Sequence, residues 1–410
     1  MLFIYKILIN IIFFFSPLIL IIRLIKNKED PSRFREKFGF FSKNKKYGKL
    51  IWFHGASVGE VQSVIPLIER FEKNKSVSQI LITSNTVSSS NIIKKFNLKK
   101  TIHQFFPIDC DFISKKFIDY WKPSKVFLID SEIWPNTINN LSSKKIPIIL
   151  LNGRITKKTL GRWLIFPNFA KSLFQKFQIC LSSSLESKKY LKKLGAKNIK
   201  FIGNLKFSQS ENESLGLDKS LVNFIKSKNS WCASSTHYNE EKFCGQTHLK
   251  LCKKYKNLLT IIIPRHISRT KSIENELSNL NLKVHLDEPK KKIRPDTSIY
   301  LVNSYGKTKS FYKECKNIFL GGSIINHGGQ NPLEAVRYGC KVFHGPNISN
   351  FKEIYDFLKS KRLSKKITSH KNLADLLDMT FKKKNHSKQI SQNLYLIGKN
   401  ILNKTYKEIR

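Results

Sequence analysis

Acidic residues and paired cysteines are scarce in this sequence. Its 410 residues contain 29 Asp and Glu against 74 Lys and Arg, a formal net charge of +45. This excess implies a polyanionic neighbour, such as nucleic acid, anionic lipid headgroups or a phosphorylated substrate, although lysines scattered over a solvated surface would give the same total. The seven cysteines form no CxxC pair and are odd in number, which argues against a disulfide framework or a zinc site. They indicate reduced, mostly buried thiols in a cytosolic compartment.

Internal repeats and nucleic-acid-binding signatures are also missing. Without repeats of solenoid period, a stacked-repeat architecture is excluded. Without a clustered aromatic and basic stripe, charge is the only support for binding to nucleic acid. Hydrophobic residues make up 40% of the chain and aromatic residues 12%, which is enough to build cores. A chain of this length with this composition predicts two folded domains.

The N-terminus is the one long apolar run. Residues 2–22 are apolar except for Lys6, Asn10 and Ser16, with Pro17 in the middle. About 20 residues suffice to span a bilayer, and the absence of a small-residue cleavage site argues against a signal peptide. The basic cluster over residues 23–37 should stay cytoplasmic. We therefore predict a membrane anchor over residues 1–25, which either spans the bilayer or lies in its interface or on the protein.

After the anchor, short apolar runs alternate with amphipathic stretches. Buried strands are predicted over 50–54, 79–83, 125–129, 146–151 and 178–182, and helices over 59–71, 88–96 and 160–177. A polar, glycine-containing segment at 209–218 predicts a linker. A second series follows, with strands near 231–234, 259–263, 298–302, 318–320 and 341–343. The pattern predicts two α/β domains with mostly parallel sheets, over 26–208 and 219–410, facing a cleft at the carboxyl ends of their strands.

Two carboxylates follow strand ends in the first domain. In the segment HGASVGE (54–60), the glycines allow a close approach to a ligand, and Glu60 falls in the first helical turn. There it could act as a general base or be an ordinary first-turn residue. Glu132 in DSEIWPN (130–136) is a second carboxylate, either catalytic or capping. The short Asp-x-Asp match at Asp109 and Asp111 is common by chance, and Asp111 is a natural helix cap.

Further polar motifs end strands in the second domain. Arg265 offers a planar fork for phosphate or carboxylate, whereas His266 is typical of a packed or capping histidine. The glycine pair Gly321 and Gly322 could cradle phosphate with backbone amides. Pro332 is predicted to start a helix that carries Glu334 in its first turn, a geometry suited to ribose hydroxyls.

Taken together, these motifs resemble the 3-deoxy-D-manno-octulosonic acid (Kdo) transferase family, in order along nearly the whole chain. Besides the apolar N-terminus with its basic tail, the matching segments are HGASVGE, SEIWPN, LNGRIT (151–156), GNLKF (203–207), SSTHYNEE (234–241), IPRH (263–266), FLGGS (319–323) and GGQNPLE (328–334). The family usually has His where Gln330 stands and Glu where Lys307 stands. Both departures lie at the expected nucleotide site and bear on donor affinity rather than on reaction class.

The resemblance implies a two-domain GT-B fold and an inverting, metal-independent transfer of Kdo from CMP-Kdo to a lipid A precursor in lipopolysaccharide biosynthesis. It implies an inner-membrane enzyme with cytoplasmic domains and no cofactor. Its expected partners are CMP-Kdo, the lipid A precursor and the anionic inner leaflet, and not nucleic acid. Glu60 would be the base. Glu132 is predicted to be a second catalytic carboxylate from its own place at a strand end, and not from the resemblance. The expected substrate and CMP contacts are Ser57, Gly59, Arg154, Lys206, Ser235, Thr236, Pro264, Arg265, Tyr305, Gly306, Lys307, Gly321, Gly322, Ser323, Asn331, Pro332, Leu333 and Glu334.

Two other interpretations remain open at this point. Another GT-B enzyme, such as an N-acetylglucosamine transferase or an epimerase that uses a UDP-sugar, would share the fold and the glycine turns. A basic nucleic-acid-binding protein would share only the charge.

Overall fold

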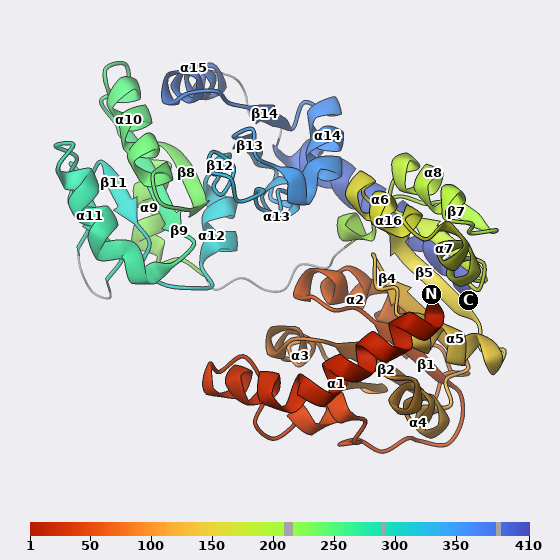
Figure 1. The fold of residues 1–410 in the computed structure, drawn as a ribbon. Helices are drawn as coiled ribbons and strands as arrows, with labels where there is room; N and C mark the ends of the chain where they lie inside the picture. Colours follow the sequence, from red (N-terminus) through yellow and green to blue (C-terminus); the bar gives the residue numbers. More distant parts are fainter. Residues whose placement is uncertain (209–215, 289–291, 383–386) are drawn as a thin grey trace. The chain divides into compact units, whose positions relative to one another are not determined.

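A computed structural model describes residues 1–208, 216–288, 292–382 and 387–410 (Figure 1). The chain forms two compact units, Met1–Ser210 together with Ile397–Arg410, and Glu211–Leu396. Most of the predicted linker at 209–218 lies outside the described residues. Each unit contains a seven-stranded sheet in which every pair of neighbouring strands is parallel, as the alternation of strands and helices predicts.

The first sheet has the strand order β3-β2-β1-β4-β5-β6-β7. Its strands are β1 (Leu50–His54), β2 (Gln79–Ser84), β3 (Thr101–Phe105), β4 (Lys125–Ile129), β5 (Ile148–Gly153), β6 (Ile179–Ser182) and β7 (Ile199–Phe201). The order reverses between β1 and β4, and ligands bind outside the carboxyl ends of strands at such a switch point. The segments that carry Glu60 and Glu132 begin there.

Several connecting helices of this unit start at a Ser or Thr side chain that accepts a hydrogen bond from a backbone amide of the first turn. The connecting helices are α2 (Val58–Glu72), α3 (Val87–Ile93), α4 (Asp111–Trp121), α5 (Pro135–Ser143), α6 (Lys157–Leu164), α7 (Pro167–Phe174) and α8 (Leu185–Lys193), with 3-10 turns η1 (Phe34–Phe38) and η2 (Leu205–Ser208). The prediction of one helix over 160–177 is wrong. Pro167 stands at the first position of α7, where its missing N–H costs nothing, whereas inside a longer helix it would break the backbone ladder.

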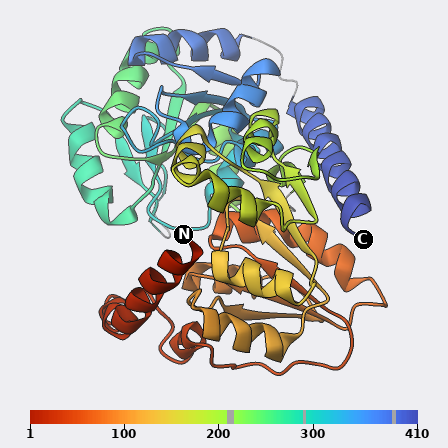
Figure 2. The same cartoon turned by 45° about the vertical axis from the view of Figure 1, so that its right-hand side comes forward.

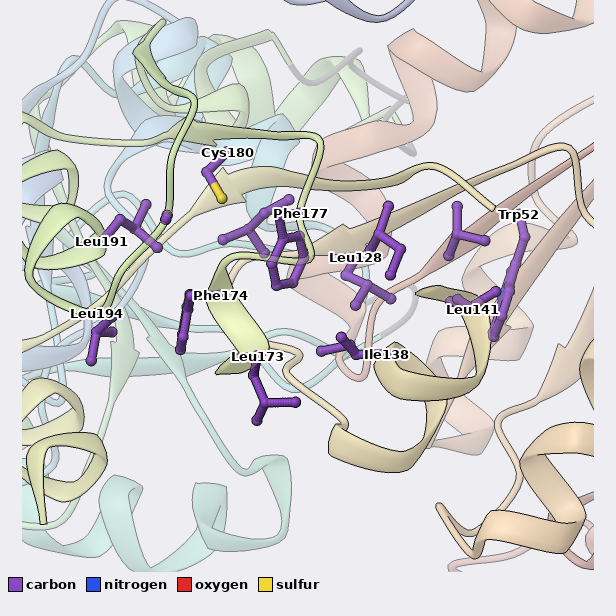
Figure 3. Close-up of a cluster of buried hydrophobic side chains, with 14 of the residues drawn as sticks. Trp52, Leu128, Ile138, Leu141, Leu173, Phe174, Phe177, Cys180, Leu191 and Leu194 are labelled. Atoms are coloured by element: carbon purple, nitrogen blue, oxygen red, sulfur yellow. The ribbon is translucent and has the colours of Figure 1, made fainter. Parts of the chain in front are cut away.

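An apolar cluster fixes the strands beneath α4, α5 and α7. Figure 3 shows its side chains, which include Trp52 on β1, Leu128 on β4, Ile138 on α5 and Phe174 on α7, all buried. Since each of these elements contributes to one packed layer, the loops at the carboxyl ends of the strands are held on a rigid base.

The C-terminal helix α16 (Ser387–Ile409) ends in the first unit. The prediction that the second domain extends over 219–410 is therefore corrected at its C-terminal end. The ring of Tyr406 lies 5.2 Å from that of Phe71 on α2, and the Lys125 ammonium donates to the Ile409 carbonyl at 2.7 Å. Residues 397–410 therefore belong to the first unit rather than to the second.

The second sheet has the order β10-β11-β9-β8-β12-β13-β14. Its strands are β8 (Asn229–Thr236), β9 (Leu258–Pro264), β10 (Val284–Leu286), β11 (Ile299–Leu301), β12 (Asn317–Leu320), β13 (Lys341–His344) and β14 (Ser364–Lys366). Its helices are α9 (Lys219–Lys226), α10 (Glu240–Cys252), α11 (Thr270–Ser278), α12 (Thr308–Glu314), α13 (Leu333–Arg337), α14 (Lys352–Ser360) and α15 (His370–Phe381), with 3-10 turns η3 (Ile267–Arg269) and η4 (Ser349–Phe351). Trp231, Phe319 and Phe343 are fully buried in its core.

The apolar N-terminus forms one helix, α1 (Leu2–Ile25), at the edge of the first unit (Figure 2). It is long and apolar enough to cross a membrane by length and composition, and little of it is buried. Pro17 cannot donate to the Phe13 carbonyl, but the Ser16 hydroxyl donates to that oxygen at 2.6 Å. The helix therefore continues through the proline.

Only one narrow face of α1 contacts the protein. Ile9, Ser16 and Leu20 are buried, and Tyr5 and Phe13 are half-buried, so the covered positions recur every three or four residues along the helix. The remaining faces carry exposed apolar side chains, among them Phe3, Phe14 and Leu18, and Phe14 is 77% exposed.

Candidate active site

Glu60 is fixed at the start of α2, directly after β1. Ser57 is the N-cap residue: its hydroxyl accepts from the Glu60 amide and donates to Glu60 Oε1 at 2.9 Å. The Ala56 amide donates to Glu60 Oε2 at 2.7 Å. This reciprocal arrangement resembles a capping box, with the amide of Ala56 in place of the N-cap amide. It confirms a local structural role for Glu60 but also holds its carboxylate in one orientation.

The pKa of Glu60 is raised to about 7. Burial is the largest cause, followed by the negative charges of Asp130 and Glu132. A carboxylate whose pKa lies near the working pH is suited to accept a proton from a substrate hydroxyl and to release it afterwards.

Asp130, at the end of β4, is held in an unusual backbone conformation. Its φ is +55°, and that of Asn152, at the end of β5, is +53°. The side-chain NH2 group of Asn152 donates to Asp130 Oδ1 at 2.5 Å, and the Lys206 ammonium donates to Asp130 Oδ2 at 3.1 Å. Lys206 thus pairs with a carboxylate of the first unit, and its predicted contact with CMP stays a prediction.

Glu132 lies in a second hydrogen-bonded group at the same edge. The Trp134 indole N–H donates to Glu132 Oε2 at 2.9 Å, and His54 Nε2 lies 3.2 Å from the same oxygen. His54 is fully buried and its ring stacks on Phe106, with the centroids 3.9 Å apart. Glu132 does not cap α5, whose N-cap residue is Trp134. The capping alternative for Glu132 is therefore wrong.

Two other predicted contacts lie at this edge. The Arg154 amide donates to the Asp130 carbonyl at 3.0 Å, which places the half-buried Arg154 beside Asp130. A Cβ atom built on Gly59 would meet no atom within 4 Å. The glycine therefore leaves open space at the start of α2 next to Glu60.

In the second unit, the ends of β8 and β12 pass unusually close. A Cβ atom on Gly321 would lie 2.4 Å from the Ser235 carbonyl oxygen and 2.6 Å from Thr236 Cα, so only glycine fits there. The Arg265 amide donates to the Thr236 carbonyl at 2.9 Å, and Pro264 is paired with Thr236 in the sheet. The predicted residues of three strands are thereby brought to one edge.

The glycine turn does not offer free amides. The amide of Gly322 donates to Glu240 Oε2 at 2.7 Å, and those of Ser323 and Ile324 donate to Glu240 Oε1 at 3.1 and 3.0 Å. Glu240 is fully buried. The expectation that these amides cradle phosphate is wrong because an internal carboxylate already occupies them, and a phosphate placed there would meet its charge.

Cationic and imidazole groups surround the same edge. Arg265 is exposed, and Arg269 forms a two-bond ion pair with the buried Glu241 at 3.0 and 3.1 Å. The pKa of His237 is lowered to about 4, first by burial and then by the neighbouring groups, which are His327, His266, Arg265 and Arg269. Because the lowered pKa keeps His237 neutral and Arg269 is paired with Glu241, Arg265 is the group of this set that offers an exposed positive charge to a nucleotide phosphate.

The turn predicted to contact CMP follows β11. Tyr305 is largely exposed, Gly306 has a φ of +91°, and the Lys307 ammonium donates to Asp287 Oδ2 at 2.8 Å. The lysine that departs from the family pattern is thus held by an internal ion pair, and Asp287 also accepts from Tyr300 at 2.8 Å.

The last predicted segment forms the start of α13. Asn331 Oδ1 accepts from the Leu333 amide at 3.1 Å. Pro332 is the N-cap residue and α13 begins at Leu333, one residue later than predicted, while Glu334 lies in the first turn as expected. Leu333 is buried in the core, whereas Glu334 is half-buried.

The Asp-x-Asp segment is used within the fold. Asp109 accepts from the amides of Asn136 and Thr137 at 2.9 and 2.8 Å, and Asp111 pairs with Lys115 at 2.8 Å. Cys110, and not Asp111, is the N-cap residue of α4. Within the described ranges, no group of three or more His, Cys, Asp or Glu residues could hold a metal ion. A metal-independent reaction stays a prediction.

Two parallel-sheet units, each with polar residues at the carboxyl ends of its strands, define the GT-B-like class of glycosyltransferases and nucleotide-sugar epimerases. The UDP-GlcNAc 2-epimerase of Neisseria meningitidis, solved with UDP-GlcNAc bound, has a similar fold, with a TM-score of 0.59 and 16% identity over 88% of this chain and 98% of that one. At this identity the likeness concerns the fold alone.

Sequence similarity narrows the class to one family. Residues 32–209 match the profile of 3-deoxy-D-manno-octulosonic-acid transferase (kdotransferase). The chain is 32% identical to a probable mitochondrial 3-deoxy-D-manno-octulosonic acid transferase of Arabidopsis thaliana, over 80% of this chain and 76% of that protein. It is 26% identical to the 3-deoxy-D-manno-octulosonic acid transferase of Haemophilus influenzae, over 92% and 89%. The chain belongs to the 3-deoxy-D-manno-octulosonic acid transferase family and is a glycosyltransferase.

Proposed function

We propose that this enzyme transfers Kdo from CMP-Kdo to a lipid A precursor with inversion of the anomeric centre, and that Glu60 is the general base. The observation that carries the proposal is the raised pKa of Glu60, about 7, on a carboxylate held by Ser57 and Ala56 at the switch point of the first sheet. A family member with this group at this place has the base that the reaction needs.

The reaction is a single displacement. Glu60 accepts the proton of the acceptor hydroxyl, whose oxygen forms a bond to the anomeric carbon from the face opposite CMP. The bond from that carbon to the phosphate oxygen breaks, and CMP departs with the electron pair. Attack and departure on opposite faces invert the centre. The charges of Asp130 and Glu132 keep the pKa of Glu60 high enough to hold the abstracted proton.

The second unit is the proposed donor-binding unit. Because Glu240 occupies the amides of the glycine turn, the charge on the departing phosphate has to be offset by side chains instead. Arg265 is exposed at the end of β9 and its guanidinium can form two parallel hydrogen bonds to phosphate. Glu334, in the first turn of α13, is the proposed partner of the ribose hydroxyls.

We further propose that α1 lies in the membrane interface and does not span the bilayer. A helix of 24 residues is about 36 Å long, and its protein-facing stripe runs from Tyr5 to Leu20. If α1 crossed the bilayer in this position, the charged residues beside it, such as Asp111, would enter the hydrocarbon. Lying flat, the helix buries its exposed apolar faces in one leaflet, proposed to be the cytoplasmic leaflet of the inner membrane.

The assay for this function offers the purified protein two donors. CMP-Kdo and a UDP-sugar are each incubated with a lipid A precursor such as lipid IVA, and the product is analysed by mass spectrometry and by NMR of the new anomeric centre. We expect added Kdo units with inverted configuration from CMP-Kdo only. Turnover of the UDP-sugar alone would refute the proposal and favour the nucleotide-sugar epimerase or transferase alternative. Retained configuration would refute the displacement mechanism.

A further inference from the structure

Asp109 is a buried carboxylate that the proposed reaction does not use, and it accepts four hydrogen bonds. It is 1% exposed. Its Oδ1 accepts from the Thr137 amide at 2.8 Å and from the Thr137 hydroxyl at 2.6 Å. Its Oδ2 accepts from the Asn136 amide and from the Tyr5 hydroxyl, both at 2.9 Å. Asp109 therefore joins two elements that are otherwise distant in sequence, α1 and α5.

On the α5 side, Asp109 replaces a missing cap. The N-cap residue of α5, Trp134, has no capping hydrogen bond of its own, and the orphan amides at the helix start are satisfied by Asp109 from the β3–α4 loop. Glu132 and Trp134 lie in the segment just before α5, and the Trp134 indole N–H donates a hydrogen bond to Glu132. The position of Asp109 thus fixes the segment that places Glu132 near Glu60.

On the α1 side, the Tyr5 hydroxyl belongs to the protein-facing stripe of the apolar helix. Near the same end of α1, Ile9 packs against Cys110 and Ile113 of the first unit. The ring of Phe13 lies 5.4 Å from that of Phe112 on α4. A helix that lies in the membrane interface is therefore in direct contact with the residue that caps α5.

We propose that Asp109 is a positioning residue that couples the seating of α1 on the first unit to the geometry of the Glu132–Trp134 segment beside the general base. The enzyme would then reach full activity only with α1 in place along the domain. This inference rests on the proposed function, because it assigns a kinetic consequence to the position of Glu132 relative to Glu60.

Tyr5→Phe tests the coupling with the smallest change, since it removes one hydroxyl from Asp109 and keeps the ring. The matched control is Tyr190→Phe, which removes a tyrosine hydroxyl that donates to a carboxylate, Glu186 Oε1, at 2.7 Å on α8. Transfer is measured with detergent-dispersed acceptor, so that membrane binding does not limit the rate. Hydrogen exchange of the amides over 130–137 is followed on the same proteins by mass spectrometry.

For Tyr5→Phe we expect kcat to fall about three- to tenfold, the effect of one net hydrogen bond, with an unchanged KM for CMP-Kdo. The rising limb of the pH–rate profile should move to lower pH, because Glu132 is held less firmly near Glu60. The amide hydrogens over 130–137 should exchange faster. The melting temperature and the binding to vesicles should equal those of the control Tyr190→Phe. Asp109→Asn should give the same changes in kcat, pH–rate profile and exchange, with a kcat loss on the order of tenfold or more. Its melting temperature should fall as well, because an NH2 group then faces amide and hydroxyl donors in a buried place.

The coupling is refuted if Tyr5→Phe and Asp109→Asn both fold and keep the wild-type kcat and pH–rate profile. It is also refuted if Tyr5→Phe loses only vesicle binding, since α1 would then serve the membrane alone. Failure of the proposed function is a separate result, in which wild-type protein does not transfer Kdo. In that case the exchange rates still decide whether Tyr5 holds the 130–137 segment.

Discussion

Asp130 and Asn152 are held in strained backbone conformations at the site of the first unit. Both have left-handed backbone conformations at the ends of neighbouring strands, and non-glycine residues in such conformations typically cost about 1–3 kcal/mol each. The hydrogen bond between their side chains, at 2.5 Å, holds a negative charge close enough to Glu60 to raise its pKa. Strain retained at this place is consistent with a role in the reaction.

The pH dependence of the rate should report these neighbouring charges. Glu60 acts as a base only when it is ionised, so the wild-type rate should rise as the pH passes through about 7. Asp130→Asn and Glu132→Gln each remove a charge that raises the pKa of Glu60, and the rising limb should therefore move to lower pH. The profile of kcat between about pH 5 and 9 measures this. Asp119→Asn, on the exposed side of α4, is the control, and an unchanged limb in both site variants would contradict the assignment.

Arg265 is the residue with the clearest expected contribution to nucleotide binding. Arg265→Ala should weaken CMP binding by about 1.5–3 kcal/mol, because a charged hydrogen-bonding fork to phosphate is lost. Titration calorimetry of CMP measures the difference. Arg294→Ala removes an exposed arginine from the same unit and should leave the affinity unchanged. Equal affinities of all three proteins would count against the placement of CMP at the end of β9.

At the scale of elements, Glu240 holds the turn after β12 to the start of α10. Its carboxylate accepts from the amides of His237, Gly322, Ser323 and Ile324. Glu240→Gln leaves one acceptor oxygen and turns an NH2 group toward amide donors. We expect a loss of about 2–4 kcal/mol in the free energy of unfolding, together with weaker CMP binding.

Urea denaturation of the two proteins measures that loss. Asp375→Asn is the control, since it breaks an exposed ion pair with Lys250 in the same unit and should cost less than about 1 kcal/mol. If Glu240→Gln were as stable as this control, the carboxylate would not organise the turn.

The sequence predicts those strands and helices that are marked by a local pattern of apolar and polar residues. The strands predicted over 50–54, 79–83 and 125–129 are apolar runs bounded by polar turns, and they form β1, β2 and β4, which are largely buried as expected. Strands β3, β7, β10 and β14 were not predicted. β7, β10 and β14 are only three residues long, and β3 (TIHQF) mixes polar and apolar residues, so none of them forms an apolar run long enough to be recognised. The return of α16 to the first unit depends on distant packing, such as Tyr406 against Phe71, which no local pattern contains.

The same distinction applies to the site. Glu60 and Glu132 could be placed from the sequence because each follows a predicted strand, and strand ends meet at one edge of a parallel sheet. Glu240 could not be matched to the glycine turn, which lies 82 residues away from it along the chain. For the same reason, the pair between Lys206 and Asp130, 76 residues apart, could not be foreseen.

At the scale of the molecule, we propose that α1 and the net charge of +45 act together at a membrane. Binding to anionic vesicles should weaken with salt, because each Lys or Arg near the surface contributes about 1 kcal/mol that screening removes. Substituting Phe14 and Leu18 by Ser, both exposed on α1, should abolish binding to neutral vesicles without lowering the melting temperature. Flotation assays measure both effects.

The orientation of α1 in those vesicles separates an interfacial helix from a spanning one. A cysteine introduced by Leu2→Cys should react with a membrane-impermeant reagent added to the side on which the protein was bound. Reaction only from the opposite side would show that α1 crosses the bilayer and would refute the interfacial position.

The most direct test of the central claim is the rate of Kdo transfer from CMP-Kdo to lipid IVA by wild-type protein, Glu60→Gln and Glu69→Gln. Glutamine keeps the shape of Glu60 but cannot accept the proton, so Glu60→Gln should lose about 10²–10⁴-fold in kcat while its affinity for CMP stays unchanged. Glu69→Gln, on the same helix α2, should transfer at the wild-type rate. A Glu60→Gln variant that retains more than about a third of wild-type turnover would contradict the account, because a general base contributes far more than that.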